Sequence, residues 1–176
     1  MSRLPPQPDY DYVVERITRF IRRSVEKAGA KGVVMGLSGG VDSATAAALT
    51  VKALGPERVT ALIMPDSSTT PSQDVDDAVE LAKLLQIKHH FIDIHGVYET
   101  LAKIMPFHDP DALIANGNMR ARIRMLILYY YANLNNLLVC GTGDKSEILL
   151  GYFTKYGDGG VDILPLGDLY KTQVRT

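Results

Sequence analysis

Cysteine is nearly absent from the 176-residue sequence, because Cys140 is the only one. A single cysteine excludes an intrachain disulfide framework and a cysteine-based zinc site, and we expect a reducing, cytoplasmic setting. An excess of charge of one sign is also missing, since 19 lysines and arginines face 20 aspartates and glutamates. This balance excludes the strongly basic surface of a dedicated nucleic-acid-binding protein, so we expect no nucleic-acid partner.

Long apolar runs and internal repeats are missing as well. No run reaches about 18 apolar residues, so we expect no transmembrane helix and no membrane partner. Residues 1–6 contain two prolines and no apolar signal core. With 46% apolar residues, the chain fits one globular domain over residues 1–176, because single domains usually span about 100–200 residues.

Short apolar runs alternate with segments of helical period along the chain. We predict strands over 33–37, 59–64, 88–92 and 137–140, and helices over 10–28, 44–54, 73–85, 97–104 and 118–133. Strands without polar alternation are typical of a parallel sheet buried on both faces. The sequence therefore predicts an α/β fold, a doubly wound open parallel sheet of the Rossmann-like kind with helices on both faces. Ligands of such sheets bind beyond the carboxyl ends of the strands.

A glycine-containing loop, Ser38–Ser43, joins the first predicted strand to the next helix. Its glycines allow close approach of the backbone, and the helix start supplies unpaired N–H groups, so the loop suits a phosphate. The lysine of a Walker A loop is missing, and Asp42 stands there instead. A carboxylate beside a phosphate requires a cation between them, which predicts Mg²⁺. The alternative is an ordinary glycine-rich turn, with Asp42 merely in the first turn of the helix.

Two further polar segments follow the fourth predicted strand. In Gly141–Glu147, Glu147 is the natural second carboxylate for the metal, although Ser146 and Glu147 could instead only cap a helix. Gly151–Asp162 contains four glycines, two acids and a lysine, a composition that indicates a binding loop rather than core.

The sequence resembles a known enzyme superfamily at these segments. Ser-Gly-Gly-Val-Asp-Ser at 38–43 is similar to the Ser-Gly-Gly-x-Asp-Ser signature of the N-type ATP pyrophosphatases, which implies the adenine nucleotide alpha-hydrolase type of the fold. Gly-Tyr-Phe-Thr-Lys-Tyr-Gly-Asp-Gly-Gly-Val-Asp-Ile-Leu-Pro-Leu at 151–166 and Gly-Asn-Met-Arg-Ala-Arg-Ile-Arg-Met at 117–125 resemble the NAD synthetase family specifically. The resemblance implies a ligase that amidates deamido-NAD with ammonia and cleaves ATP to AMP and pyrophosphate.

The resemblance also implies roles for individual residues. Asp42 and Glu147 would bind Mg²⁺. Asp158 and Lys171 would be catalytic, with Asp158 near the nicotinate end, where ammonia attacks. Deamido-NAD would contact Arg122, Lys155 and Asp162. ATP would contact Gly36, Leu37, Ser38, Gly39, Gly40, Val41, Asp42, Ser43, Thr142 and Lys171.

The family comparison further implies a homodimer, and ammonia that arrives free or from a separate glutaminase subunit. Family members continue beyond the position of Thr176, so we expect the family's C-terminal segment to be lacking here. Two alternatives stay open: another N-type ATP pyrophosphatase, such as a GMP-synthetase-like amidating domain, and a nucleotide-binding module without catalysis.

Histidines and arginines outside these segments carry less information. The four histidines lack helical metal-ligand spacing, which favours a solvent or packing role for each. Arg120, Arg122 and Arg124 are compatible with an ordinary solvated helix face, and only Arg122 is assigned a role by the resemblance.

Overall fold

The computed structural model describes residues 7–176, and its centre is one four-stranded parallel sheet. The strands, in the spatial order β3-β2-β1-β4, are β1 (Gly32–Gly36), β2 (Val59–Ile63), β3 (Lys88–Phe91) and β4 (Leu137–Cys140). Val33 of β1 lies opposite Val59 on one side and Leu138 on the other. The predicted parallel sheet is confirmed. The prediction that the N-terminus has no signal core concerns residues 1–6, which lie outside the described residues.

One helix precedes the first strand, and the others connect the strands or follow the last one. The helices are α1 (Tyr10–Lys27), α2 (Val41–Leu54), α3 (Ser72–Leu84), α4 (His95–Ile104), α5 (Leu113–Asn135), α6 (Lys145–Leu150) and α7 (Lys171–Val174), with a short 3-10 turn, η1 (Pro56–Arg58). The prediction was wrong about where α2 and α5 begin. Helix α2 begins at Val41 rather than Ala44, directly after its cap Gly40. Helix α5 continues through Gly117, because a glycine weakens a helix without breaking it.

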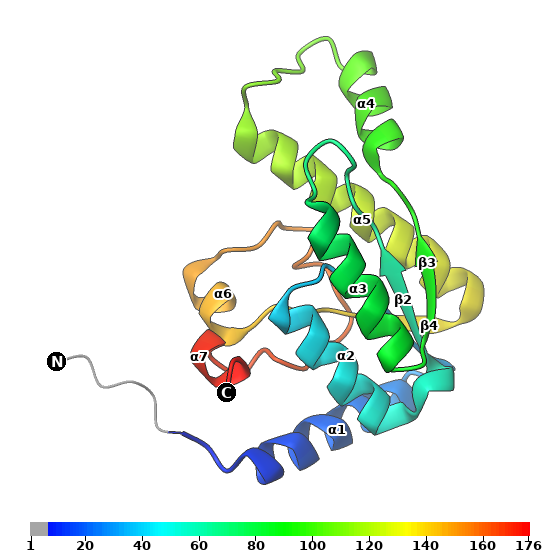
Figure 1. Cartoon of the computed structure of the whole chain (residues 1–176), viewed down its shortest axis with the longest axis vertical. Helices are drawn as coiled ribbons and strands as arrows, with labels where there is room; N and C mark the ends of the chain where they lie inside the picture. The colour runs from blue at the N-terminus through cyan, green and yellow to red at the C-terminus, as the bar shows by residue number, and fades with distance from the viewer. Residues whose placement is uncertain (1–6) are drawn as a thin grey trace, which may run out of the picture.

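Helices cover both faces of the sheet (Figure 1), and the central strands β1 and β2 bury side chains on both faces, whereas the edge strand β3 has no buried residue. Val33 and Met35 of β1 belong to a core formed with α1, α2 and α3. Val34, between them, belongs to a second core with α4 and α5, because successive side chains of a strand point to opposite faces. This arrangement confirms the Rossmann-like fold with helices on both faces.

All four strands run in parallel, so the loops that follow them leave from one edge of the sheet. The segment after β4 returns to this edge, where Ile163 forms a parallel bridge with Cys140. Lys171 N donates to Ser146 Oγ at 3.1 Å, which joins α7 to α6 (Figure 1). None of the helices within residues 7–176 combines the length and apolar character that a membrane span requires.

Candidate active site

The turn between β1 and α2 is built around Gly39. Its φ is +80°, and an added Cβ would lie 2.4 Å from the carbonyl oxygen of Asp74 in α3, so only glycine fits. Ser38 and Ser43 brace the turn. Ser43 Oγ donates to Gly40 O at 2.9 Å and accepts from Ser38 N at 3.3 Å. The first N–H groups of α2 therefore begin at a narrow, fixed turn, an arrangement suited to an anion.

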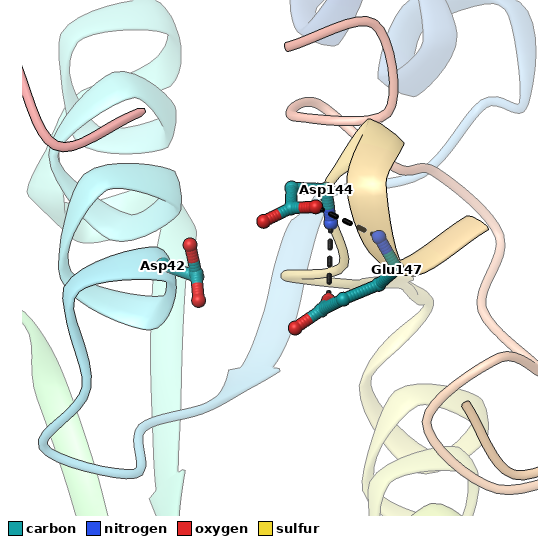
Figure 2. A group of neighbouring side chains, drawn as sticks. All are labelled: Asp42, Asp144 and Glu147. Atoms are coloured by element: carbon teal, nitrogen blue, oxygen red, sulfur yellow. Dashed lines mark hydrogen bonds between the residues drawn. The ribbon is translucent and has the colours of Figure 1, made fainter. Parts of the chain in front are cut away.

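Three carboxylates meet beside this turn, from segments far apart in the sequence (Figure 2). Asp42 lies in the first turn of α2, Asp144 caps α6, and Glu147 lies in the first turn of α6. One oxygen of each lies within 4.8 Å of the others. Asp42 Oδ1 is buried and has no hydrogen-bond partner among residues 7–176. We call these three residues the acid cluster.

Glu147 serves as a helix cap and as a member of the acid cluster at the same time. Its Oε2 accepts from Asp144 N at 3.2 Å, while Asp144 Oδ1 accepts from Glu147 N at 2.9 Å (Figure 2). This reciprocal pair is a capping box. Because it uses one oxygen of each residue, Glu147 Oε1 and Asp144 Oδ2 face the remaining member of the cluster. The two interpretations of this segment from sequence are therefore compatible.

Lys171 places its ammonium group among the three carboxylates. Its Nζ pairs with Asp42 and lies 3.0 Å from Asp144 Oδ2 and 3.2 Å from Glu147 Oε1. Burial disfavours the charge of Lys171, but the hydrogen bonds to the carboxylates outweigh burial and raise its pKa above the ordinary value. One ammonium against three carboxylates leaves two negative charges in excess. A divalent cation would balance this excess.

Sequence reasoning missed Asp144 as a member of the cluster. Its side chain is fully buried, and burial alone would raise its pKa. The Glu147 amide and Lys171 outweigh burial and lower the pKa, so the group stays ionised. The Asp-x-x-Glu spacing of a capping box was the signal that could have found it, because that motif places Asp144 directly beside Glu147.

A cavity of about 480 Å³ opens next to the glycine turn. Of the residues predicted to contact ATP, its lining includes Gly36, Leu37, Ser38 and Thr142, and the predicted catalytic Asp158 also lines it. The volume lies in the usual range for a small-molecule site.

Arg124 brings a positive charge to the lining of this cavity. Its Nε donates to Met64 O at 2.8 Å, which fixes the side chain against the end of β2. Burial lowers the pKa of Arg124, while nearby Asp66 favours its charge. The structure thus offers a cation at the cavity that the resemblance did not assign.

The residues predicted to bind deamido-NAD lie along the glycine-rich loop and α5. Arg122 Nε donates to Lys155 O at 3.1 Å, so these two meet. Asp162 is occupied by protein donors, because its two oxygens accept from Tyr129 OH at 3.0 Å and Val139 N at 2.8 Å. Burial and Asp162 raise the pKa of Tyr129 to about 12, which keeps its hydroxyl a donor.

Comparisons of the sequence with known proteins show which family the chain resembles. The NAD synthase family model matches residues 13–176. The NH(3)-dependent NAD(+) synthetase of Staphylothermus marinus is 58% identical over 94% of this chain. The chain spans 60% of that relative and of a second one, from Hyperthermus butylicus.

Solved structures agree with the sequence comparisons. The NH3-dependent NAD synthetase of Campylobacter jejuni superimposes with a TM-score of 0.88 at 40% identity, over 95% of this chain and 71% of that one. An NMN synthetase from Francisella tularensis superimposes with a TM-score of 0.86 at 44% identity, over 93% of this chain and 67% of that one.

Proposed function

Because the chain belongs to the NAD synthase family, we propose that it amidates deamido-NAD with ammonia while cleaving ATP to AMP and pyrophosphate. The observation that carries the proposal is the acid cluster beside a glycine turn and a cavity of nucleotide size. An acidic cluster next to an anion-binding turn suits a nucleotide whose phosphates carry a divalent cation.

The donor set of the acid cluster fits Mg²⁺. Asp42, Glu147 and Asp144 offer carboxylate oxygens, the ligand type that Mg²⁺ prefers, and Asp42 Oδ1 is buried without a partner among the described residues. Asp42 and Glu147 would hold the ion. When bound, Mg²⁺ would supply positive charge next to the phosphate oxygens.

The chain's own groups address the charge problem of the first step. The nicotinate carboxylate must attack the α-phosphorus of ATP, where two anions repel each other. Lys171 holds its ammonium at this edge of the sheet, and the N–H groups at the start of α2 face the same region. These positive groups stabilise the charge that develops on the departing pyrophosphate.

Asp158 would handle a proton in the second step. Ammonia attacks the acyl carbon of the adenylate, AMP leaves, and the new nitrogen loses a proton. Asp158 lines the cavity, and its Oδ1 accepts from Thr154 N at 2.8 Å, which orients the carboxylate. We assign it the general-base role. Arg122, Lys155 and the segment around Asp162 would bind deamido-NAD.

A mononucleotide substrate is the second candidate. The similarity to the Francisella tularensis NMN synthetase, at 44% identity, favours the same amidation on the mononucleotide. The two candidates share the ATP chemistry and differ only in the portion of the substrate beyond the nicotinate ribose phosphate.

We also propose that two copies of the chain associate through α5. Apolar residues lie on opposite faces of the second half of this helix: Met125, Leu128 and Ala132 face the core, while Leu126, Tyr130 and Leu134 are 69%, 72% and 71% exposed. A helix that is apolar on all sides is usually buried on all sides. We propose further that ammonia arrives free or from a separate glutaminase subunit, and that the protein works in the cytoplasm, which its single buried thiol supports.

The test is a pyrophosphate-release assay with ATP, Mg²⁺ and ammonium. We expect pyrophosphate and NAD in equal amounts with deamido-NAD and no product with XMP. Faster turnover of nicotinate mononucleotide than of deamido-NAD would favour the second candidate. If the protein binds ATP but releases no pyrophosphate from it with any of the three acceptor substrates, the chain is a binding module and the proposal is contradicted. Asp158→Asn with full ammonia-dependent turnover would remove the general-base assignment.

A further inference from the structure

A second group of charged side chains lies at the end of β2, outside the acid cluster. Asp66 is fully buried. Its Oδ2 accepts from Arg120 Nε at 2.5 Å, and its Oδ1 lies 3.0 Å from His95 Nδ1. Ser68 donates to Oδ1 twice, from its amide at 3.0 Å and from its hydroxyl at 2.6 Å. One carboxylate thus joins the loop after β2 to α4 and α5.

The partners of Asp66 are themselves held in place. The guanidinium of Arg120 lies 3.7 Å from the centre of the Tyr98 ring, and its side chain is only 18% exposed. The prediction of a solvated helix face was therefore wrong for Arg120. Burial would raise the pKa of Asp66, but Ser68 and Arg120 outweigh it and hold the pKa well below the ordinary value.

Asp66 also closes the loop of residues 65–71 through its main chain. Its carbonyl accepts from Thr69 N at 2.9 Å and Thr70 N at 2.8 Å, and its amide donates to Thr70 Oγ1 at 3.0 Å. Thr69, Thr70 and Pro71 line the cavity next to the glycine turn. The buried carboxylate therefore fixes one wall of that cavity.

The same loop leads into the start of α3, which packs against the glycine turn. Pro71 directly precedes α3, and the main chain of Asp74, in the first turn of α3, lies against Gly39 with no room for a Cβ. A shift of the loop at Asp66 would move the start of α3. It would thereby change the space in which Gly39 is confined.

We propose that Asp66 is a positioning residue for the nucleotide: anchored by Arg120 and Ser68, it holds residues 65–71 and the start of α3 in the geometry that ATP binds. The inference rests on the proposed function for the identity of the nucleotide. Asp66 touches neither the phosphates nor the reacting carboxylate in this role, because it acts through the cavity wall.

Asp66→Asn is the decisive variant. Ser68 N and Arg120 Nε can only donate, and they bond to different oxygens of Asp66. The amide group of an asparagine would have to face one of these two donors, whichever way it is flipped. We expect the KM and the equilibrium Kd for ATP to rise about tenfold or more. The KM for deamido-NAD should change little, because Arg122 and Lys155 lie on α5 and the glycine-rich loop rather than in residues 65–71.

Asp93→Asn is the matched control. Asp93 also holds this loop, but both main-chain donors, Ser67 N at 3.1 Å and His95 N at 2.9 Å, bond to the same oxygen. The carbonyl of an asparagine can accept both. We expect this isosteric change to leave the Kd for ATP within about twofold of the original.

Ser68→Ala keeps the inference testable if Asp66→Asn does not fold. It removes the hydroxyl donor at 2.6 Å from Asp66 and should raise the Kd for ATP about threefold. The inference is overturned if the Kd of either variant matches that of Asp93→Asn, or if the KM for deamido-NAD rises in parallel with that for ATP. Calorimetric ATP binding separates the two proposals, since a chain that binds ATP but forms no NAD refutes the function alone.

Discussion

At the scale of single residues, Gly39 determines the shape of the phosphate-binding turn. With φ at +80° and the carbonyl of Asp74 2.4 Å from the place of a Cβ, Gly39→Ala must displace either the turn or α3. We expect a loss of stability of about 1–3 kcal/mol and a loss of ATP binding. Urea unfolding and calorimetry would measure the two effects.

Gly96→Ala provides the comparison for this change. Gly96 lies in α4, and an added Cβ there would meet no atom within 4 Å. Alanine should stabilise this site by about 0.5–1 kcal/mol and leave ATP binding unchanged. Equal ATP affinity in both variants would contradict the role assigned to Gly39.

Cys140 permits a prediction about pH at the same scale. Burial raises the pKa of its thiol to about 12, despite a hydrogen bond with Thr50. Only the thiolate reacts with an aromatic disulfide reagent, so at pH 8 the folded protein should react at least about 100-fold more slowly than the urea-unfolded chain. One thiol per chain should then appear on unfolding. Rapid labelling of the folded protein at pH 8 would show that Cys140 is accessible.

Residue-level prediction from the sequence succeeded where one general rule sufficed. Asp42 and Glu147 follow different parallel strands, and the carboxyl ends of such strands share one edge, so their proximity was predictable. Asp66 and Arg120 were not predictable in this way. Their pairing depends on how α5 crosses the end of β2, which no spacing in the sequence reveals.

At the scale of elements, α6 combines helix capping with the acid cluster, and the two can be separated. Glu147→Gln keeps a side-chain oxygen for the capping box but removes the charge from Oε1. We expect the free energy of unfolding to change by less than about 0.5 kcal/mol while the Mg²⁺ concentration needed for half-maximal pyrophosphate release rises about tenfold or more.

Asp144→Ala is the companion to Glu147→Gln. It removes the cap acceptor of Glu147 N and should cost about 1 kcal/mol of stability. Because Asp144 also belongs to the acid cluster, Asp144→Ala should raise the Mg²⁺ requirement as well, so the separation depends on unfolding in urea and a Mg²⁺ titration of Glu147→Gln. An unchanged Mg²⁺ requirement in Glu147→Gln would argue that Glu147 only caps the helix.

Element boundaries were predicted best where composition changes sharply. Strand β4 was predicted with its observed limits, because its apolar run of four residues stands between Asn136 and Gly141. Helix α5 was predicted too short, over 118–133, whereas it spans Leu113–Asn135. Intrinsic propensity is a weak guide when a long helix is fixed by its packing on the sheet.

At the scale of the whole molecule, α5 connects the cavity wall to the glycine-rich loop. Its Arg120 anchors the cavity wall, Arg124 lines the cavity, Arg122 meets the glycine-rich loop and Tyr129 holds Asp162. The sequence predicted a helix here but not this role, because the contacts come from two segments far apart in the sequence, the loop after β2 and the glycine-rich loop. The helix must therefore keep its position on the sheet, and a partner on its exposed face would help to fix it.

The exposed face of α5 leads to a prediction about association. Leu126, Tyr130 and Leu134 are four residues apart and form one stripe on the helix. If two copies pack these stripes together, Tyr130→Glu places a charge in an apolar contact and should weaken the dimer about 100-fold or more. Leu84→Glu is the control, because Leu84 is a comparably exposed apolar residue on α3, at 77%. Sedimentation should show dimers of the original chain and of Leu84→Glu but monomers of Tyr130→Glu. A monomeric original chain at micromolar concentration would refute association through α5, and a dimeric Tyr130→Glu would place the interface elsewhere.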